Sequence, residues 1–289
     1  MLSLYDVPAP AKLNLFLHIT GRRADGYHLL QSVFMLIDWC DTLHFERRAG
    51  GHITREDLAE PLPADDLCLR AARALQAASG CSHGAHIGVL KRIPAQAGLG
   101  GGSSDAATTL LALNRLWNLG LTRDQLQAIG VTLGADVPFF LGRGSAWVEG
   151  IGDVVQPLAP DHALEPSRFV IVKPQAGLQT QQIFSHPLLK RDFDHATIAG
   201  FADAHRQAPY AFGTNALQPA AQALCPEIAQ AIAWLQSQRL KPRMTGSGSA
   251  VFARLSHDFD LPTDLSRWQV KICDNLTLHP LADWTPDQG

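Results

Sequence analysis

One short segment gathers four glycines and two serines, a composition suited to binding an anion: Pro94-Ala-Gln-Ala-Gly-Leu-Gly-Gly-Gly-Ser-Ser-Asp-Ala-Ala107. Glycine lets a backbone approach a ligand closely and adopt positive φ. We expect a helix to begin at Ser103 or Ser104, where its free N–H groups and dipole would attract negative charge. The segment matches neither a Walker loop nor a dinucleotide fingerprint. It therefore predicts a loop that binds the phosphates of a nucleoside triphosphate, with a flexible surface loop as the alternative.

A second glycine segment, Thr245-Gly-Ser-Gly-Ser-Ala250, lies between two stretches that resemble strands. Alone it indicates no more than a hairpin turn. Together with the first loop, it could line the same site from another domain.

Strands and helices must position these loops. Strict alternation of apolar residues predicts a strand over 11–19, with Lys12 and Asn14 on one face. Asp66 is expected to cap a helix that stops at Gly80. Other strands are predicted over 29–39, 42–47, 85–91, 145–149, 169–172, 250–255 and 268–273. Other helices are predicted over 103–120 and 122–129 and near 179–184 and 227–235. A polar loop is expected over 50–63 and a linker over 156–167. This irregular mixture favours an α+β fold over a doubly wound sheet.

Composition limits the function further. The 289 residues suffice for about two domains. The 24 Lys and Arg against 27 Asp and Glu leave no basic excess for a nucleic-acid partner. We expect no membrane segment and no export signal. The five scattered cysteines fit a reduced cytoplasmic protein, and Cys81, His83 and His86 lack the second pair that a zinc site needs.

Three segments, Pro10–Leu17, Pro94–Ala107 and Thr245–Ala250, together resemble the three motifs of the GHMP kinases in order and spacing. Within that family, Asp25-Gly-Tyr-His28 and Gly134-Ala-Asp-Val-Pro138 resemble the branch that phosphorylates a cytidine-diphosphate ester of methylerythritol in the non-mevalonate route to isoprenoid precursors. The resemblance extends from Ala9 to about Phe252.

The resemblance implies a two-domain α+β GHMP kinase fold, with an ATP-binding domain over residues 1–156, a second domain over 157–289 and the active site in the cleft between them. It implies that ATP phosphorylates the 2-hydroxyl of the acceptor and that Mg²⁺ takes part. The alternatives are a GHMP kinase of homoserine or mevalonate, and a nucleotide-binding regulator without catalysis. The expected partners are ATP and a small-molecule acceptor, and we expect a monomer or a weak homodimer.

The resemblance also assigns roles to single residues. It makes Asp136 the base that takes the proton of the acceptor hydroxyl, and Lys12 its electrostatic partner. Tyr27 and Phe184 would stack on the two faces of a cytosine whose edge His28 reads. The implied substrate-binding residues are Asn14, Tyr27, His28, Thr180, Phe184 and Gly246, and the implied ATP-binding residues are Asp66, Pro94, Ala95, Gln96, Ala97, Gly98, Leu99, Gly100, Gly101, Gly102, Ser103 and Ser104.

Two positions depart from the pattern of the family. Asp66 stands where relatives often have an asparagine facing adenine, and a carboxylate can accept but not donate a hydrogen bond. Ala95-Gln-Ala97 replaces a more glycine-rich approach to the loop. These departures affect the contact with adenine and the path of the chain before Gly98.

Overall fold

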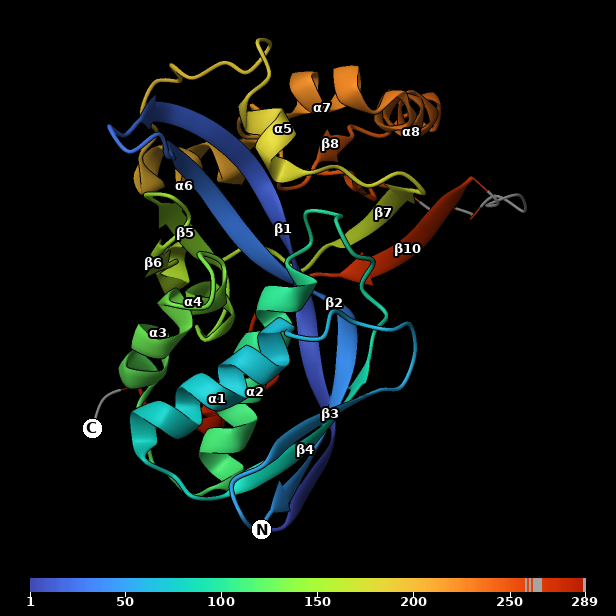
Figure 1. Cartoon of the computed structure of the whole chain (residues 1–289). Coiled ribbons are helices and arrows are strands. Elements are labelled where there is room, and N and C mark those ends of the chain that lie inside the picture. Colours follow the sequence, from blue (N-terminus) through green and yellow to red (C-terminus); the bar gives the residue numbers. More distant parts are fainter. Residues whose placement is uncertain (258, 260, 262–266, 288–289) are drawn as a thin grey trace.

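A long antiparallel hairpin runs through the structure, a computed structural model that describes residues 1–257, 259, 261 and 267–287 (Figure 1). Its strands are β1 (Ser3–Arg22) and β2 (His28–Arg48). The predicted strand over 11–19 is the middle of β1. The two predicted strands over 29–39 and 42–47 are one continuous strand, because a register shift between Pro10 and Ala11 absorbs the break in alternation near Cys40.

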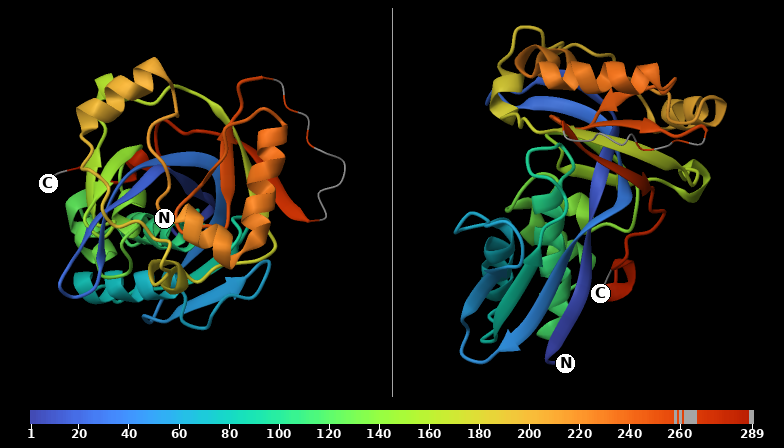
Figure 2. Two further views of the ribbon diagram at one scale, coloured as in Figure 1. Left: turned by 90° about the horizontal axis from the view of Figure 1, so that it is seen from above. Right: turned by 90° about the vertical axis from the view of Figure 1, so that its right-hand side faces the viewer.

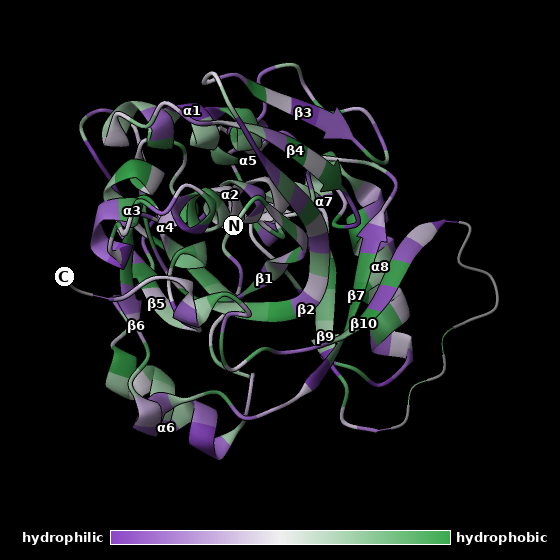
Figure 3. Ribbon diagram, turned by 90° about the horizontal axis from the view of Figure 1, so that it is seen from below, coloured by the Kyte–Doolittle hydropathy of each residue, from purple (hydrophilic) through white to green (hydrophobic). Residues whose placement is uncertain are grey.

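A first sheet forms around this hairpin. β2 pairs with β4 (Gly84–Leu90) and β5 (Ala146–Glu149), β5 pairs with β6 (Val154–Pro157), and β3 (Ile53–Asp57) lies parallel to β4 at the edge. The prediction of a polar loop over residues 50–63 was therefore wrong. β3 is an edge strand with largely hydrophilic residues, which suit an unpaired edge (Figure 3).

Helices α1 (Leu67–Ser79) and α2 (Gly101–Leu116) pack on this sheet, followed by α3 (Arg123–Val131) and the short α4 (Val137–Phe140). Two predicted caps are confirmed: Asp66 accepts bonds from the N–H groups of Cys68 and Leu69, and Gly80 ends α1 with φ of 65°. Thr122 and Gln125 form the predicted capping box.

The second sheet has the strand order β10-β7-β9-β8 in the described residues. The bounds are β7 (Arg168–Pro174), β8 (Arg243–Met244), β9 (Val251–Arg254) and β10 (Trp268–Asp274). The helices of this half are α5 (Thr180–Phe184), α6 (Ile198–Gln207), α7 (Gln218–Leu224) and α8 (Pro226–Ser237), and two 3-10 turns are η1 (Pro160–His162) and η2 (Ala282–Trp284). Sequence patterns did not predict α6 and α7.

Apolar side chains of the described residues form three buried clusters, and β1 contributes to each of them. Val7 and Ala9 lie in the cluster beneath α1 and α2, Leu13 in the middle cluster, and Leu17 and Ile19 in the cluster with α7 and α8. Figure 2 shows the hairpin running from one half of the molecule into the other. Leu281 returns to the first cluster. The division at residues 156 and 157 stays a prediction.

Candidate active site

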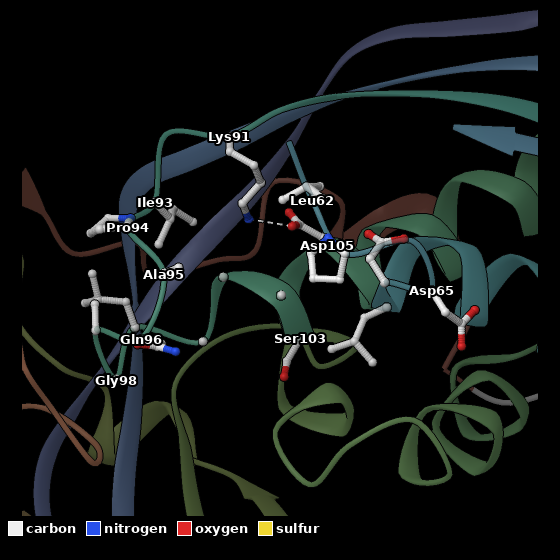
Figure 4. A pocket seen from close by; sticks show the side chains of 18 residues that line it. Leu62, Asp65, Lys91, Ile93, Pro94, Ala95, Gln96, Gly98, Ser103 and Asp105 are labelled. Atoms are coloured by element: carbon white, nitrogen blue, oxygen red, sulfur yellow. Dashed lines mark hydrogen bonds and ion pairs between the residues drawn. The ribbon is translucent and has the colours of Figure 1, made fainter. Parts of the chain in front are cut away.

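The glycine-rich loop forms one wall of a cavity of about 490 Å³ (Figure 4). Residues 94–103 line it, and Asp66 and Leu67 at the start of α1 face them. Of the residues predicted to bind ATP, Ser104 alone is not part of this lining. Its side chain is fully buried, and its hydroxyl has no hydrogen-bond partner in the described part of the chain.

Helix α2 begins earlier than the sequence suggested. Its N-cap is Gly100, with φ of 74°, and its first helical residue is Gly101, so the predicted start at Ser103 or Ser104 was wrong. The φ of Gly100 lies in the left-handed region, which glycine adopts without strain. The first intrahelical bond runs from the N–H of Ser104 to the Gly100 carbonyl. The N–H groups of the three preceding residues therefore have no acceptor within the helix, which suits a phosphate.

Backbone contacts fasten this loop to the second glycine segment. The N–H groups of Ser249 and Ala250 donate to the carbonyls of Gln96 and Ala97, both at 3.2 Å. A Cβ on Gly98 would overlap the Thr245 carbonyl oxygen, and one on Gly246 would lie 2.8 Å from the Gly98 oxygen. The two segments, 147 residues apart at Gly98 and Thr245, are therefore in direct contact, and their lining of one site stays a prediction.

Lys12 and Asp136 come together beside this loop. The Lys12 ammonium lies 3.6 Å from Asp136 Oδ2 and donates to Asn14 Oδ1, which confirms that Lys12 and Asn14 share a face of β1. The ammonium also lies 4.5 Å from the centre of the Phe34 ring. The Lys12 N–H donates to the Leu99 carbonyl at 2.9 Å, which ties the strand to the glycine loop.

Burial differs sharply within this pair. The side chain of Lys12 is 4% exposed and that of Asp136 is 31% exposed. Burial lowers the pKa of Lys12 below its ordinary value, and the negative charge of Asp136 partly opposes that shift. Asp136 is the N-cap of α4 and makes no capping bond, so its carboxylate is available to a ligand.

The predicted acceptor residues lie at the tip of the hairpin and on α5. A tight turn, with Gly26 at φ of 92°, brings Tyr27 and His28 to the start of β2. The His28 ring stacks on Phe184, with centroids 5.0 Å apart and an interplanar angle of 26°. The Tyr27 side chain is 61% exposed. The placement of a cytosine between Tyr27 and Phe184 stays a prediction, and one face of Phe184 already contacts His28.

Thr180 faces the second glycine segment. Its hydroxyl lies 3.0 Å from the hydroxyl of Ser247, and Asn215 Nδ2 donates to the Gly246 carbonyl at 2.9 Å. Asn14 is joined to the same segment, since its N–H donates to Thr245 Oγ1 at 2.9 Å, but it is buried, and the contact of these residues with the acceptor stays a prediction.

Sequence reasoning missed several residues around the cavity. Lys91 lines it and binds both Asp41 and Asp105, the latter at 2.5 Å. Burial raises the pKa of Asp105 to about 8 against the opposing effect of Lys91. The only local signal is the position of Lys91 at the end of a predicted strand.

Arg55 of β3 pairs with Asp66 at 2.7 Å. Both carboxylate oxygens of Asp66 are thereby engaged, by Arg55 and by the start of α1. The contact of Asp66 with adenine stays a prediction. His86, considered above for zinc, instead lies 2.9 Å from the Thr54 hydroxyl.

Comparisons with known proteins fit this geometry. Residues 66–144 match the family model of the GHMP kinase N-terminal domain, and residues 195–269 match that of the C-terminal domain. A 4-diphosphocytidyl-2-C-methyl-D-erythritol kinase of Acidovorax sp. (strain JS42) is 69% identical over 98% of this chain and 99% of its own length. The protein of that name from Paracidovorax citrulli (strain AAC00-1) is 66% identical over the full length of both chains.

Solved structures agree. A crystal structure of 4-(cytidine 5'-diphospho)-2C-methyl-D-erythritol kinase matches with a TM-score of 0.76 and 31% identity, covering 94% of this chain and 98% of that one. A homoserine kinase from Cytophaga hutchinsonii matches with a TM-score of 0.67 over 96% of this chain and 95% of its own, but at 14% identity it shows the fold alone.

Fold and site define a small-molecule kinase of the GHMP class, with the α+β architecture that the three motifs predicted. Within that class, the chain belongs to the 4-diphosphocytidyl-2-C-methyl-D-erythritol kinase family. In the described residues, no helix is both long enough and apolar enough to span a bilayer.

Proposed function

We propose that this chain transfers the γ-phosphoryl group of ATP to the 2-hydroxyl of 4-diphosphocytidyl-2-C-methyl-D-erythritol, a step of the non-mevalonate route to isoprenoid precursors. The observation that carries this proposal is the Lys12–Asp136 pair, at 3.6 Å, beside a glycine loop whose N–H groups suit phosphates. The names of relatives at 60–69% identity supply the acceptor. Homoserine and mevalonate kinases share the fold at 14–15% identity, so they give no comparable support for the alternatives.

Asp136 acts as the general base in this proposal. Its carboxylate is partly exposed and free of capping bonds, so it can accept the proton of a hydroxyl that attacks the γ-phosphorus. The proton moves from the acceptor oxygen to the carboxylate as the new O–P bond forms and ADP leaves.

Lys12 stabilises the charges of this step. A buried ammonium in a site of low dielectric interacts strongly with nearby negative charge. The Asn14 carboxamide oxygen accepts a hydrogen bond from this ammonium and thereby holds it beside Asp136 and the phosphate loop. Because Lys12 also bonds through its backbone to Leu99, its side chain and the loop hold a fixed mutual position.

ATP fits the cavity because its lining combines unpaired helix N–H groups with an apolar floor that includes Leu67 and Ile93. The lining beside the phosphate loop also fits Mg²⁺, because the Ser103 side chain, whose hydroxyl oxygen can bind a hard cation, lies in the cavity wall. Magnesium usually takes few protein ligands together with phosphate oxygens. The Ser103 hydroxyl would help to hold the ion, which would offset phosphate charge, and Asp136 would stay available as the base.

We place this protein in the cytoplasm as a monomer or weak homodimer. The cytoplasmic location is supported by its five cysteines, which all lie in the described residues and form no disulfide there. Size-exclusion chromatography with light scattering would test the oligomeric state.

A coupled assay of ADP release tests the function. The cytidine-diphosphate acceptor should support turnover, whereas homoserine, mevalonate and galactose at equal concentration should not. A faster reaction with homoserine or mevalonate than with the cytidine acceptor would contradict the proposal. Asp136→Asn serves as the control for contaminating ATPases.

A further inference from the structure

Arg191 joins three parts of the acceptor site. Its Nε donates to His28 Nε2 at 3.1 Å, its Nη2 to the Phe184 carbonyl at 3.0 Å and its Nη1 to the Leu189 carbonyl at 3.1 Å. No carboxylate lies within 4.0 Å of it among the residues that the structure describes. The guanidinium therefore donates its hydrogen bonds to backbone carbonyls at and after the end of α5 and to one ring nitrogen of His28.

This contact decides where the proton of His28 lies. An arginine side chain has donors only, so a ring nitrogen that bonds to it must be an acceptor. His28 Nε2 thus carries no hydrogen, and the neutral ring carries its proton on Nδ1. Burial and the positive charges of Arg191 and Arg22 lower the pKa of His28, which keeps the ring neutral. His28 then presents an N–H donor on the ring edge away from Arg191.

We propose that Arg191 is a positioning residue that fixes the tautomer of His28 and thereby makes the acceptor site prefer cytosine to uracil. The N3 atom of cytosine is an acceptor, whereas N3 of uracil carries a hydrogen. A ring that can only donate pairs with the first and opposes the second. This inference rests on the proposed function, because it takes the cytidine end of the acceptor to lie against the stacked rings of His28 and Phe184.

The tautomer can be measured without any substrate. The full chain labelled with ¹⁵N-histidine would give the ring nitrogen shifts, with His28 assigned by its absence from the spectrum of His28→Gln. We expect a neutral ring protonated on Nδ1 at pH 7 in the wild type. A proton on Nε2, or on both nitrogens, would overturn the proposal whatever the enzyme phosphorylates.

Specificity is tested by comparing kcat/KM for the cytidine acceptor and for its uridine counterpart. Arg191→Leu should lower the cytidine-to-uridine ratio by about tenfold or more, since the freed ring can then adopt the tautomer that accepts from N3 of uracil, and the wrong base no longer leaves a buried polar group without a partner. Arg191→Lys retains a donor and should restore part of the ratio. Arg22→Leu is the matched control: it removes another nearby positive charge, on a side chain that bonds to the Gly26 carbonyl and not to His28, and should leave the ratio unchanged.

The outcomes separate the two proposals. If the wild type fails to phosphorylate the cytidine acceptor, the proposed function falls, while the nitrogen spectrum still decides the tautomer. If the wild type works but Arg191→Leu lowers both acceptors equally, Arg191 only supports the fold of its loop and the inference about specificity is overturned.

Discussion

The two sides of the active site are built differently. The nucleotide side consists of backbone fastened to backbone: the Gly98 and Thr245 segments touch so closely that neither Gly98 nor Gly246 has room for a side chain. The acceptor side consists of side chains stacked on side chains, His28 on Phe184, with Tyr27 largely exposed. Backbone geometry recognises phosphates, which all nucleotides share, whereas side chains can be exchanged to recognise a different base.

Asp136, between the two sides, should show the largest effect. Asp136→Asn should lower kcat by about 10²–10⁴-fold, because general-base assistance is lost. Binding of ATP and of the acceptor, measured by calorimetry, should change little. Turnover close to that of the wild type would remove Asp136 from its role, and loss of either binding would show that the two sides do not bind independently of it.

The nucleotide side should not tolerate even one added carbon at Gly98. Gly98→Ala places a Cβ against the Thr245 carbonyl at a φ of 73°, so we expect a loss of roughly 1–3 kcal/mol in the free energy of unfolding and a large rise in KM for ATP. Urea unfolding and initial-rate kinetics would measure both.

Gly102→Ala is the matched control. It lines the same cavity, but a Cβ there would lie 3.5 Å from Leu67, an ordinary contact, and its backbone is helical. Its stability should be near that of the wild type. Equal losses of stability in Gly98→Ala and Gly102→Ala would contradict the close fit described at Gly98.

Substitutions on the acceptor side should weaken binding of the acceptor and leave binding of ATP unchanged. Phe184→Ala should weaken acceptor binding by about ten- to a hundredfold, since stacking on a base contributes roughly 1–3 kcal/mol. Tyr27→Phe should be mild, whereas Tyr27→Ala should resemble Phe184→Ala. If Phe184→Ala lowered only the melting temperature and left acceptor affinity unchanged, Phe184 would be a core residue.

The smallest expected effect is a pH dependence at Lys12. Burial lowers its pKa below 10.5, so its charge and the activity should be lost at a lower pH than for an ordinary lysine. Between the folded and unfolded pKa values the unfolded chain binds more protons, so stability should rise with pH there. The gain is at most about 1.4 kcal/mol for each unit of the shift.

Unfolding of the wild type and of Lys12→Met across that alkaline range would measure the difference. The free energy of unfolding of the wild type should rise relative to that of Lys12→Met as the pH approaches 10.5. A constant difference across the range would mean that the pKa of Lys12 is not lowered.

Local patterns predicted those features that depend on neighbouring residues. The Asp66 and Gly80 caps and the Thr122 capping box were confirmed because each is a contact within one turn of helix. β3 was missed because its residues become a strand only by pairing with β4, about thirty residues later. The start of α2 was misplaced because its N-cap is a glycine without a capping side chain.

Contacts between distant segments account for the rest of the site. The glycine loop and the Lys12–Asn14 face were predicted from spacing alone. Arg191 was not, because it is one of 24 basic residues and meets His28 across 163 positions. Likewise, the pairing of Arg55 with Asp66 depends on the unpredicted strand β3.

The path of β1 has a mechanical consequence. This strand of 20 residues packs into all three clusters, so one continuous strand runs through both halves of the molecule. At 3.3 Å per residue its contour length is about 66 Å. A rotation of the two halves about a hinge would have to break or sharply bend β1. We expect admission of substrate and release of product to involve flexing of the hairpin and movement of its tip around Tyr27, with the three clusters along β1 staying packed.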